Sequence, residues 1–146
     1  MSSIYDQAAD KAKEQLDVIS ETMCYAKWTQ VSMHLTNGKT HSCYHPPTHD
    51  IDVEELEVNP SALHNTKEKK EQRAQMLAGE RPEGCSYCWR IEDAGNISDR
   101  VLKSMDSYSF SQYDAIANST GEEEVYPKYV EVSFSNVCNF KCSYCG

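Results

Sequence analysis

The sequence predicts an α+β fold, in which a small cysteine-rich domain made of a β-hairpin and helices is followed by one further strand and a terminal cysteine loop. Three observations predict this fold. Residues 28–43 alternate in polarity around an Asn-Gly pair, as the strands of a hairpin do. Residues 61–77 carry the mixed charges of an exposed helix face. The seven cysteines fall into a group of four and a group of three, so two separate metal sites are expected.

Length and charge limit the functions that are open to the chain. It has 146 residues and a net charge of −9, which is enough for one modest domain or for one small domain plus part of another. An acidic protein lacks the basic surface that nucleic-acid phosphates require. The N-terminus has no signal-peptide pattern, and no apolar run approaches the ~18 residues of a membrane span. We therefore expect a cytoplasmic protein with no nucleic-acid partner and no membrane partner.

The first helix is expected within residues 1–22, running from Ser3 to about Thr22. Ser2 or Ser3 can cap its N-terminus, and Asp6 lies favourably in its first turn. The apolar residues with helical spacing are Ala8, Ala9, Ala12, Leu16 and Ile19. Because this stripe is narrow, we expect the helix to pack weakly.

The next element is the hairpin of residues 28–43. Asn37-Gly38 is the strongest short-range hairpin signal, because both turn positions tolerate positive φ. The residues that alternate along the first strand are Val31, Ser32, Met33, His34 and Leu35. The second strand should end at Cys43. This geometry places Cys24 and Cys43 at the same end of the hairpin, on opposite limbs.

A loop and a second helix are expected to follow the hairpin. Two consecutive prolines exclude regular structure from part of residues 44–60, whose acidic run indicates a solvated surface with room for one helical turn. Residues 61–77 should be helical, with Asn65 as the cap and Glu68 reaching back to it. Gly79 should end this helix.

A Cys-x2-Cys pair, a linker and a strand complete the expected elements. Residues 90–100 should form a short helix that is broken near Gly95. Residues 104–128 are polar and poorly periodic, which indicates a linker that partly docks on its neighbours. Residues 129–135 alternate in polarity and predict a strand that leads into the terminal loop.

The four upstream thiols make a complete tetrathiolate site plausible. They are Cys24, Cys43, Cys85 and Cys88. A hairpin plus a Cys-x2-Cys turn is typical of zinc ribbons, and four thiolates also hold iron–sulfur clusters, so both metals stay open. His45 is an alternative nitrogen ligand, although a loop histidine is more often solvated. Trp28 and Trp89 either shield a cluster from water or simply form the core.

The terminal loop carries three thiols, Cys138, Cys142 and Cys145. Three thiolates leave one iron of a cubane cluster open to another ligand. An ordinary electron-transfer cluster or a zinc site remains an alternative, but ferredoxin-type spacing differs at the first interval, and zinc sites favour Cys-x2-Cys pairs.

This loop, Ser-Asn-Val-Cys-Asn-Phe-Lys-Cys-Ser-Tyr-Cys after a strand, resembles the cluster loop of radical S-adenosylmethionine (radical SAM) enzymes. The resemblance implies that Cys138, Cys142 and Cys145 bind a 4Fe–4S cluster. S-adenosylmethionine would bind the fourth iron, and Tyr144 would lie near its adenine. Such a centre generates a 5′-deoxyadenosyl radical that abstracts hydrogen from a substrate.

The upstream residues resemble the auxiliary-cluster module, called a twitch or SPASM-like domain, of some radical SAM proteins. The residues that carry this resemblance are Cys24-x3-Trp28, Asn37-Gly38, Cys43, Asn65-Thr66, Arg73, Met76 to Glu80, Pro82, Cys85-x2-Cys88 and Ser98-Asp99-Arg100. The resemblance covers residues 23–146. It departs at Tyr44, where a second cysteine often follows Cys43.

The two resemblances together imply a domain organisation. Residues 23–103 would form the auxiliary domain, residues 104–128 the linker, and residues 129–146 the first strand and cluster loop of a truncated radical SAM partial (β/α) barrel. An auxiliary 4Fe–4S cluster is favoured over zinc. The implied partners are S-adenosylmethionine, an electron donor such as flavodoxin or ferredoxin, and an unknown substrate, with a peptide as the first guess.

We expect the chain to be the N-terminal part of such an enzyme and to be inactive alone, because the remaining barrel strands are missing from the sequence. The alternative is a metal-stabilised module, zinc-ribbon-like or iron–sulfur, that binds a partner or transfers electrons without catalysis.

Overall fold

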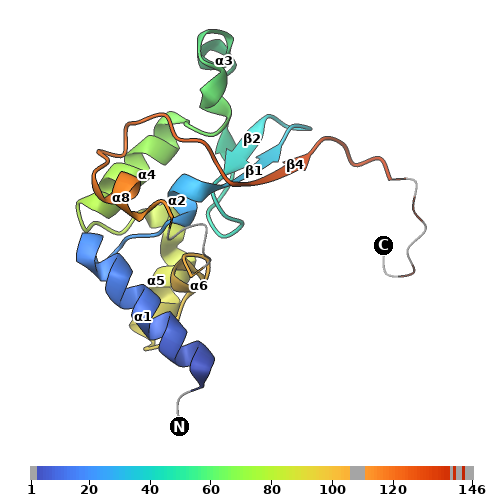
Figure 1. Cartoon of the computed structure of the whole chain (residues 1–146). Helices are drawn as coiled ribbons and strands as arrows, with labels where there is room; N and C mark the ends of the chain where they lie inside the picture. The colour runs from blue at the N-terminus through green and yellow to red at the C-terminus, as the bar shows by residue number, and fades with distance from the viewer. Residues whose placement is uncertain (1–2, 106–110, 139, 141–142, 144–146) are drawn as a thin grey trace.

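The computed structural model describes residues 3–105, 111–138, 140 and 143. It confirms a mixed α+β fold, in which helices surround one end of a small four-stranded sheet (Figure 1). None of the helices in the described ranges combines the length and apolar character that a membrane crossing requires.

Helix α1 (Ile4–Ile19) begins where the capping residues predict. The Ser3 hydroxyl accepts a hydrogen bond from the Asp6 backbone amide at 3.1 Å, and the Asp6 carboxylate accepts one from the Ser3 amide at 2.8 Å. The expectation of weak packing is wrong, because the apolar stripe is fully buried at Ala9, Ala12 and Leu16. Small alanine side chains let the helix approach the core closely.

The predicted hairpin is present, but it is shorter at both ends than the expected range of residues 28–43. Trp28 belongs to a short helix α2 (Ala26–Thr29), and the hairpin consists of β1 (Gln30–His34) and β2 (Lys39–His41). Gly38 at the turn has φ +67°, a conformation that L side chains rarely adopt. In the antiparallel register, Ser32 lies opposite His41.

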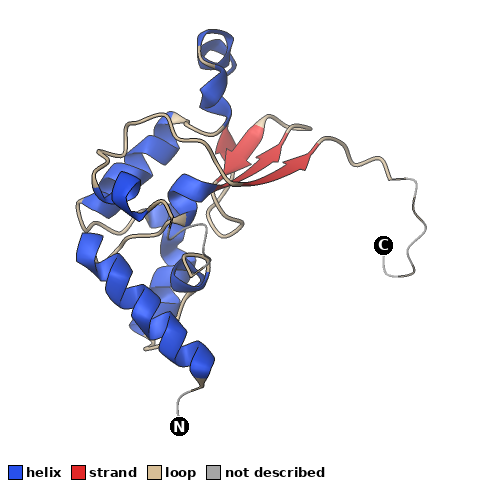
Figure 2. Cartoon of the chain, in the orientation of Figure 1, coloured by secondary structure: helices blue, strands red, loops and turns tan. Residues whose placement is uncertain are grey.

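Two more strands complete the sheet, in the order β3-β2-β1-β4 (Figure 2). β3 (His49–Asp50) pairs with β2 inside the expected loop, and two residues are too few for a periodicity signal. β4 (Tyr129–Ser133) is the predicted terminal strand, and it lies parallel to β1 at the edge of the sheet. The strand that leads to the terminal cysteines therefore shares a sheet with the hairpin.

Helices α3 (Val53–Val58), η1 (Pro60–Leu63) and α4 (Lys67–Leu77) follow β3. Thr66, and not Asn65, caps α4, since its hydroxyl accepts a hydrogen bond from the Lys69 amide. The Asn65 side chain is engaged elsewhere: its oxygen accepts from Arg73 at 2.9 Å, and its amide donates to the Val125 carbonyl at 3.0 Å. The mixed charges of α4 do not mark an exposed helix throughout, because Lys69 and Arg73 are fully buried.

The remaining helices are η2 (Glu83–Cys85), α5 (Ser86–Asp93), α6 (Asp99–Leu102) and α8 (Tyr113–Ala117). The expected break near Gly95 is confirmed, with φ +79° at that residue. Within the polar segment of residues 104–128, α8 inserts Ile116 into the core, where it is 2% exposed.

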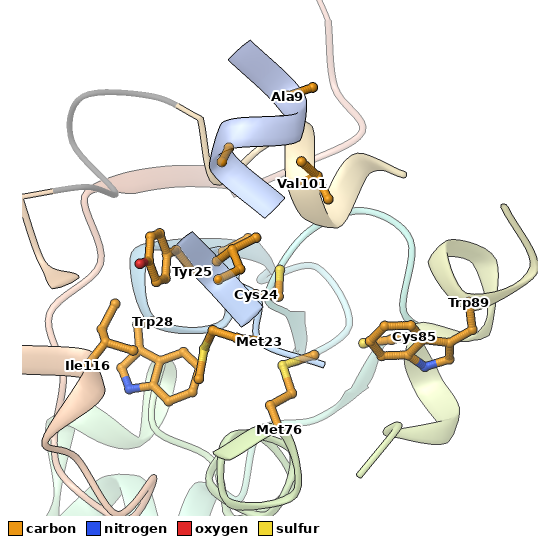
Figure 3. Packing of buried hydrophobic residues seen from close by; sticks show 13 residues of the cluster. Ala9, Met23, Cys24, Tyr25, Trp28, Met76, Cys85, Trp89, Val101 and Ile116 are labelled. Carbon is orange, nitrogen blue, oxygen red and sulfur yellow. The ribbon is translucent and has the colours of Figure 1, made fainter. Parts of the chain in front are cut away.

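The core lies between the helices and includes cysteines (Figure 3). Met23, Cys24 and Met76 pack near its centre, and Trp89 lies beside Cys85. Two of the metal-ligand candidates, Cys24 and Cys85, are therefore part of the packed interior.

Candidate metal centre

Four cysteines from three segments line one partly enclosed cavity. Cys24 lies two residues before the start of α2, Cys43 follows β2, Cys85 ends η2, and Cys88 lies in the first turn of α5. The sequence separates the first and last of them by 64 positions, 88 minus 24, yet the fold brings all four together. The geometric expectation that the hairpin gathers Cys24 and Cys43 agrees with this arrangement.

Local backbone bonds fix the loops that carry these thiols. The Lys27 amide donates to the Cys24 carbonyl at 3.1 Å, which folds the chain into α2 immediately after the first thiol. The Cys85 amide and the Trp89 indole both donate to the Pro82 carbonyl at 3.0 Å. The turn that carries the Cys-x2-Cys pair is thus tied at both ends to one carbonyl.

The thiols are free and mostly hidden from water. Cys24, Cys85 and Cys88 are 6–7% exposed, Cys43 is half-buried, and none of them forms a disulfide. Buried free cysteines that converge on one cavity are either inert packing or ligands.

Burial and mutual repulsion disfavour the thiolate form. Burial, reinforced by Cys43 and Cys85, raises the pKa of Cys24 to about 12. Burial raises the pKa of Cys88 to about 11, although hydrogen bonds from the Arg100 backbone and Ser98 oppose it. Burial also raises the pKa of Cys43. A bound metal reverses this balance, because its positive charge deprotonates coordinating thiols outright.

Three cationic side chains line the same cavity: Lys27, Arg100 and Lys103. Arg100 is 2% exposed and binds Glu92 through two bonds of 2.8 and 2.9 Å. Lys27 is also 2% exposed, and its ammonium donates to the neutral side-chain oxygen of Gln72. A buried lysine among the residues that line the thiol cavity could balance the charge of an anionic metal–thiolate centre.

The donor set fits a soft metal, but the thiols are not closed around an ion. The cavity measures about 20 Å³, which exceeds the ~10–15 Å³ that one water needs. Within the described residues, no three His, Cys, Asp or Glu side chains are placed to hold a metal ion as they stand. Four thiolates suit zinc or an iron–sulfur cluster, and either would require side-chain adjustment. A cubane cluster would require the larger side-chain adjustment, because each of its four thiolates binds a different iron.

His45 lies at the rim of the cavity. Its Nε2 atom is 2.7 Å from a carboxylate oxygen of Asp99, which also accepts from the Tyr44 hydroxyl at 2.7 Å. The His45 ring stacks on Tyr87, with centroids 3.8 Å apart. The contacts with Asp99 and Tyr87 fix the position of the His45 ring at the edge of the cavity. Its Nε2 atom is directed to Asp99 and not to the thiols.

The sequence did not indicate that cationic side chains line the cavity. It also did not indicate that only one of the two tryptophans lies there. Trp89 lines the cavity, whereas Trp28 packs in the core beside α8. Lysine and arginine in a polar chain give no signal of burial, and only the proximity of Lys27 to Cys24 in sequence could have suggested a role.

The terminal loop is described in part. Cys138 is exposed, and its sulfur accepts a hydrogen bond from the Phe140 amide at 3.4 Å. Cys142, Tyr144 and Cys145 lie outside the described residues.

No protein-family model matches the chain, and no curated protein or solved structure is significantly similar to it. The function is therefore argued from the residues and geometry above.

Proposed function

We propose that the chain contains an auxiliary iron–sulfur centre at Cys24, Cys43, Cys85 and Cys88 and the cluster loop of a radical SAM enzyme at Cys138, Cys142 and Cys145. One observation carries the proposal: four free cysteines from three separate segments line a single, partly enclosed cavity. The terminal Cys-x3-Cys-x2-Cys loop, with its resemblance to radical SAM enzymes, supplies the catalytic half of the proposal.

The four upstream thiols suit electron relay or a structural role. A tetrathiolate leaves no metal position open to substrate. Burial excludes water from the thiols, and Lys27 and Arg100 offset their negative charge.

The terminal loop would hold the second cluster. When bound, that cluster and S-adenosylmethionine supply a 5′-deoxyadenosyl radical. The chain's own part is to carry Cys138 out on the segment after β4, which runs away from the rest of the described protein (Figure 1). Phe134, Val137 and Phe140 on this segment are 75–90% exposed. Apolar side chains this exposed support a role in packing against further protein, as a barrel strand would require.

The other partners follow from the same resemblance. An electron donor such as flavodoxin or ferredoxin would reduce the clusters, a peptide is the proposed substrate class, and the cytoplasm is the proposed location because it keeps thiols reduced.

A zinc-stabilised binding module is the second candidate. The cavity of about 20 Å³ accommodates one ion with less movement of its walls than a cubane cluster would need. Under this reading the tetrathiolate would only stabilise the fold.

Metal analysis separates the two candidates. The full chain is purified anaerobically, reconstituted with iron and sulfide, and assayed for iron, sulfide and zinc. The proposal predicts two iron–sulfur clusters per chain, and addition of S-adenosylmethionine should change the electron paramagnetic resonance spectrum of only one of them. Zinc at one equivalent with no acid-labile sulfide would support the second candidate instead.

A further inference from the structure

Two histidines meet across the hairpin, on a part of the sheet that the cysteine centre does not use. His34 ends β1 and His41 ends β2, and their Nε2 atoms lie 3.0 Å apart. The ring centroids are 5.1 Å apart, with 23° between the planes. Neither ring lines the cysteine cavity. His41 is 6% exposed, and His34 is half-buried.

The short distance between the two nitrogens requires a proton or a cation between them. Two lone pairs directed at each other repel, and so do two N–H groups. A separation of 3.0 Å is therefore stable only with one shared proton or with one cation that accepts both lone pairs. Metal–nitrogen bonds of about 2.1 Å place two cis donors about 3.0 Å apart at a 90° angle and about 3.4 Å apart in a tetrahedron. The observed separation fits the 90° arrangement.

A carboxylate stands on the same face of the sheet. Ser32 on β1 lies opposite His41 on one side and opposite Glu131 of β4 on the other. Directly paired residues share a face, and His34 shares it too because it lies two positions after Ser32. The Glu131 carboxylate accepts a hydrogen bond from the Ser32 hydroxyl at 3.0 Å, which holds it on this face.

We propose that His34, His41 and Glu131 form a binding site for a divalent transition-metal ion, distinct from the cysteine centre. Two imidazoles and one carboxylate suit nickel, copper, iron or zinc ions. The thiols of the other centre prefer softer metal ions and iron–sulfur clusters. The ion replaces the proton between the rings. No closed three-donor group exists among the described residues, so Glu131 must turn from Ser32 toward the rings when the ion binds.

Nickel is the probe because its ligands can be distinguished by absorption. Ni²⁺ is titrated calorimetrically into the tag-free full chain, after both the four-cysteine centre and the terminal three-cysteine loop have been loaded with iron and sulfide. One high-affinity Ni²⁺ is expected, without the intense near-ultraviolet charge-transfer bands of nickel–thiolate bonding. His34→Ala should weaken binding at least tenfold, since even the loss of an outer-shell partner costs a metal site ~10–100-fold. Glu131→Gln should weaken it by a smaller factor.

The matched control is His49→Gln on neighbouring β3. His49 pairs with Thr40, which directly precedes His41 and so lies on the opposite face. Its Nε2 atom contacts the Thr66 hydroxyl at 2.7 Å, and the variant should keep full Ni²⁺ affinity. Glu131 is exposed, so Glu131→Gln remains informative even where His34→Ala impairs folding. Nickel affinity unchanged in both His34→Ala and Glu131→Gln, or nickel–thiolate bands in the native chain, would overturn the proposal.

Discussion

The buried ammonium of Lys27 donates its hydrogen bond to the neutral side-chain oxygen of Gln72, in the wall of the cavity that the four thiols share. Negative charge nearby stabilises a buried cation more strongly than a neutral acceptor alone does. If the proposed metal–thiolate centre is bound, it would supply that charge, and Lys27 would in turn stabilise the reduced, more negative state of the centre.

Lys27→Met should therefore lower the reduction potential of the auxiliary cluster. A unit charge at roughly 7–10 Å, with an effective dielectric constant near 20, corresponds to on the order of 50–100 mV. Redox titration of the reconstituted protein measures the shift. Lys69→Met is the matched control, since Lys69 is equally buried but bonds Thr40 and does not line the cavity. Equal potentials in native protein and Lys27→Met would refute the inference.

The four-plus-three division of the cysteines predicts independent loss of the two centres. Cys24→Ala or Cys88→Ala should remove the auxiliary cluster and halve the iron content, while the cluster of Cys138, Cys142 and Cys145 survives. Cys138→Ala should do the reverse. Iron and sulfide assays with electron paramagnetic resonance distinguish these results. Simultaneous loss of both clusters in a variant that remains folded would contradict the division.

Gly121 should not tolerate a side chain. It has φ +90°, and a Cβ atom there would lie 2.6 Å from the Ala74 backbone nitrogen of α4. Gly121→Ala should cost about 2–4 kcal/mol of unfolding free energy, from strain and from the clash together. Gly95→Ala is the control, because Gly95 has φ +79° with nothing within 4 Å of the added atom. That variant should lose only about 1 kcal/mol. Urea unfolding measures both, and equal losses would show that the close approach to α4 does not constrain the chain.

Two histidines should make the fold sensitive to acid. Burial, reinforced by nearby Lys69, lowers the pKa of His49 to about 4 and that of His64 to about 3. In the unfolded chain both titrate near pH 6.5. Below that pH the two histidines bind protons in the unfolded state but not in the folded state. The free energy of unfolding therefore falls as the pH drops from about 6.5 toward 4.

At pH 5 each histidine should cost roughly 1–2 kcal/mol relative to pH 7.5. His64→Gln should reduce this loss, because glutamine does not titrate. The measurement is urea unfolding of native and variant protein at both pH values. An identical pH dependence in the two proteins would show that His64 does not contribute to the acid sensitivity.

Patterns that depend on neighbouring residues were predicted from the sequence. The Asn37-Gly38 turn, the Ser3 cap and the break at Gly95 each follow from local backbone chemistry, and the structure has all three. The convergence of Cys24 and Cys43 also follows, because a hairpin brings its two ends together.

Features that depend on tertiary contacts were not predictable in this way. The charges of α4 indicated a solvated surface, yet Arg73 is fully buried and bonds the Lys27 carbonyl and Asn65. Because the Asn65 side chain bonds Arg73, it does not cap α4, and Thr66 caps the helix instead. Side-chain composition cannot show which polar groups find buried partners, so the cations around the thiols were also missed.

The parallel pairing of β4 with β1 has a consequence for the order of folding. Ser32 and Glu131 meet across 99 positions of chain, whereas all four upstream thiols precede the segment that carries α8. Contacts of such long separation carry a large loop-closure cost and form late. On the ribosome, the cysteine cavity can be assembled and loaded with metal while β4 is still inside the exit tunnel. The histidine and carboxylate face of the sheet is completed only afterwards, so the proposed four-cysteine site would be filled before the proposed histidine–carboxylate site during synthesis.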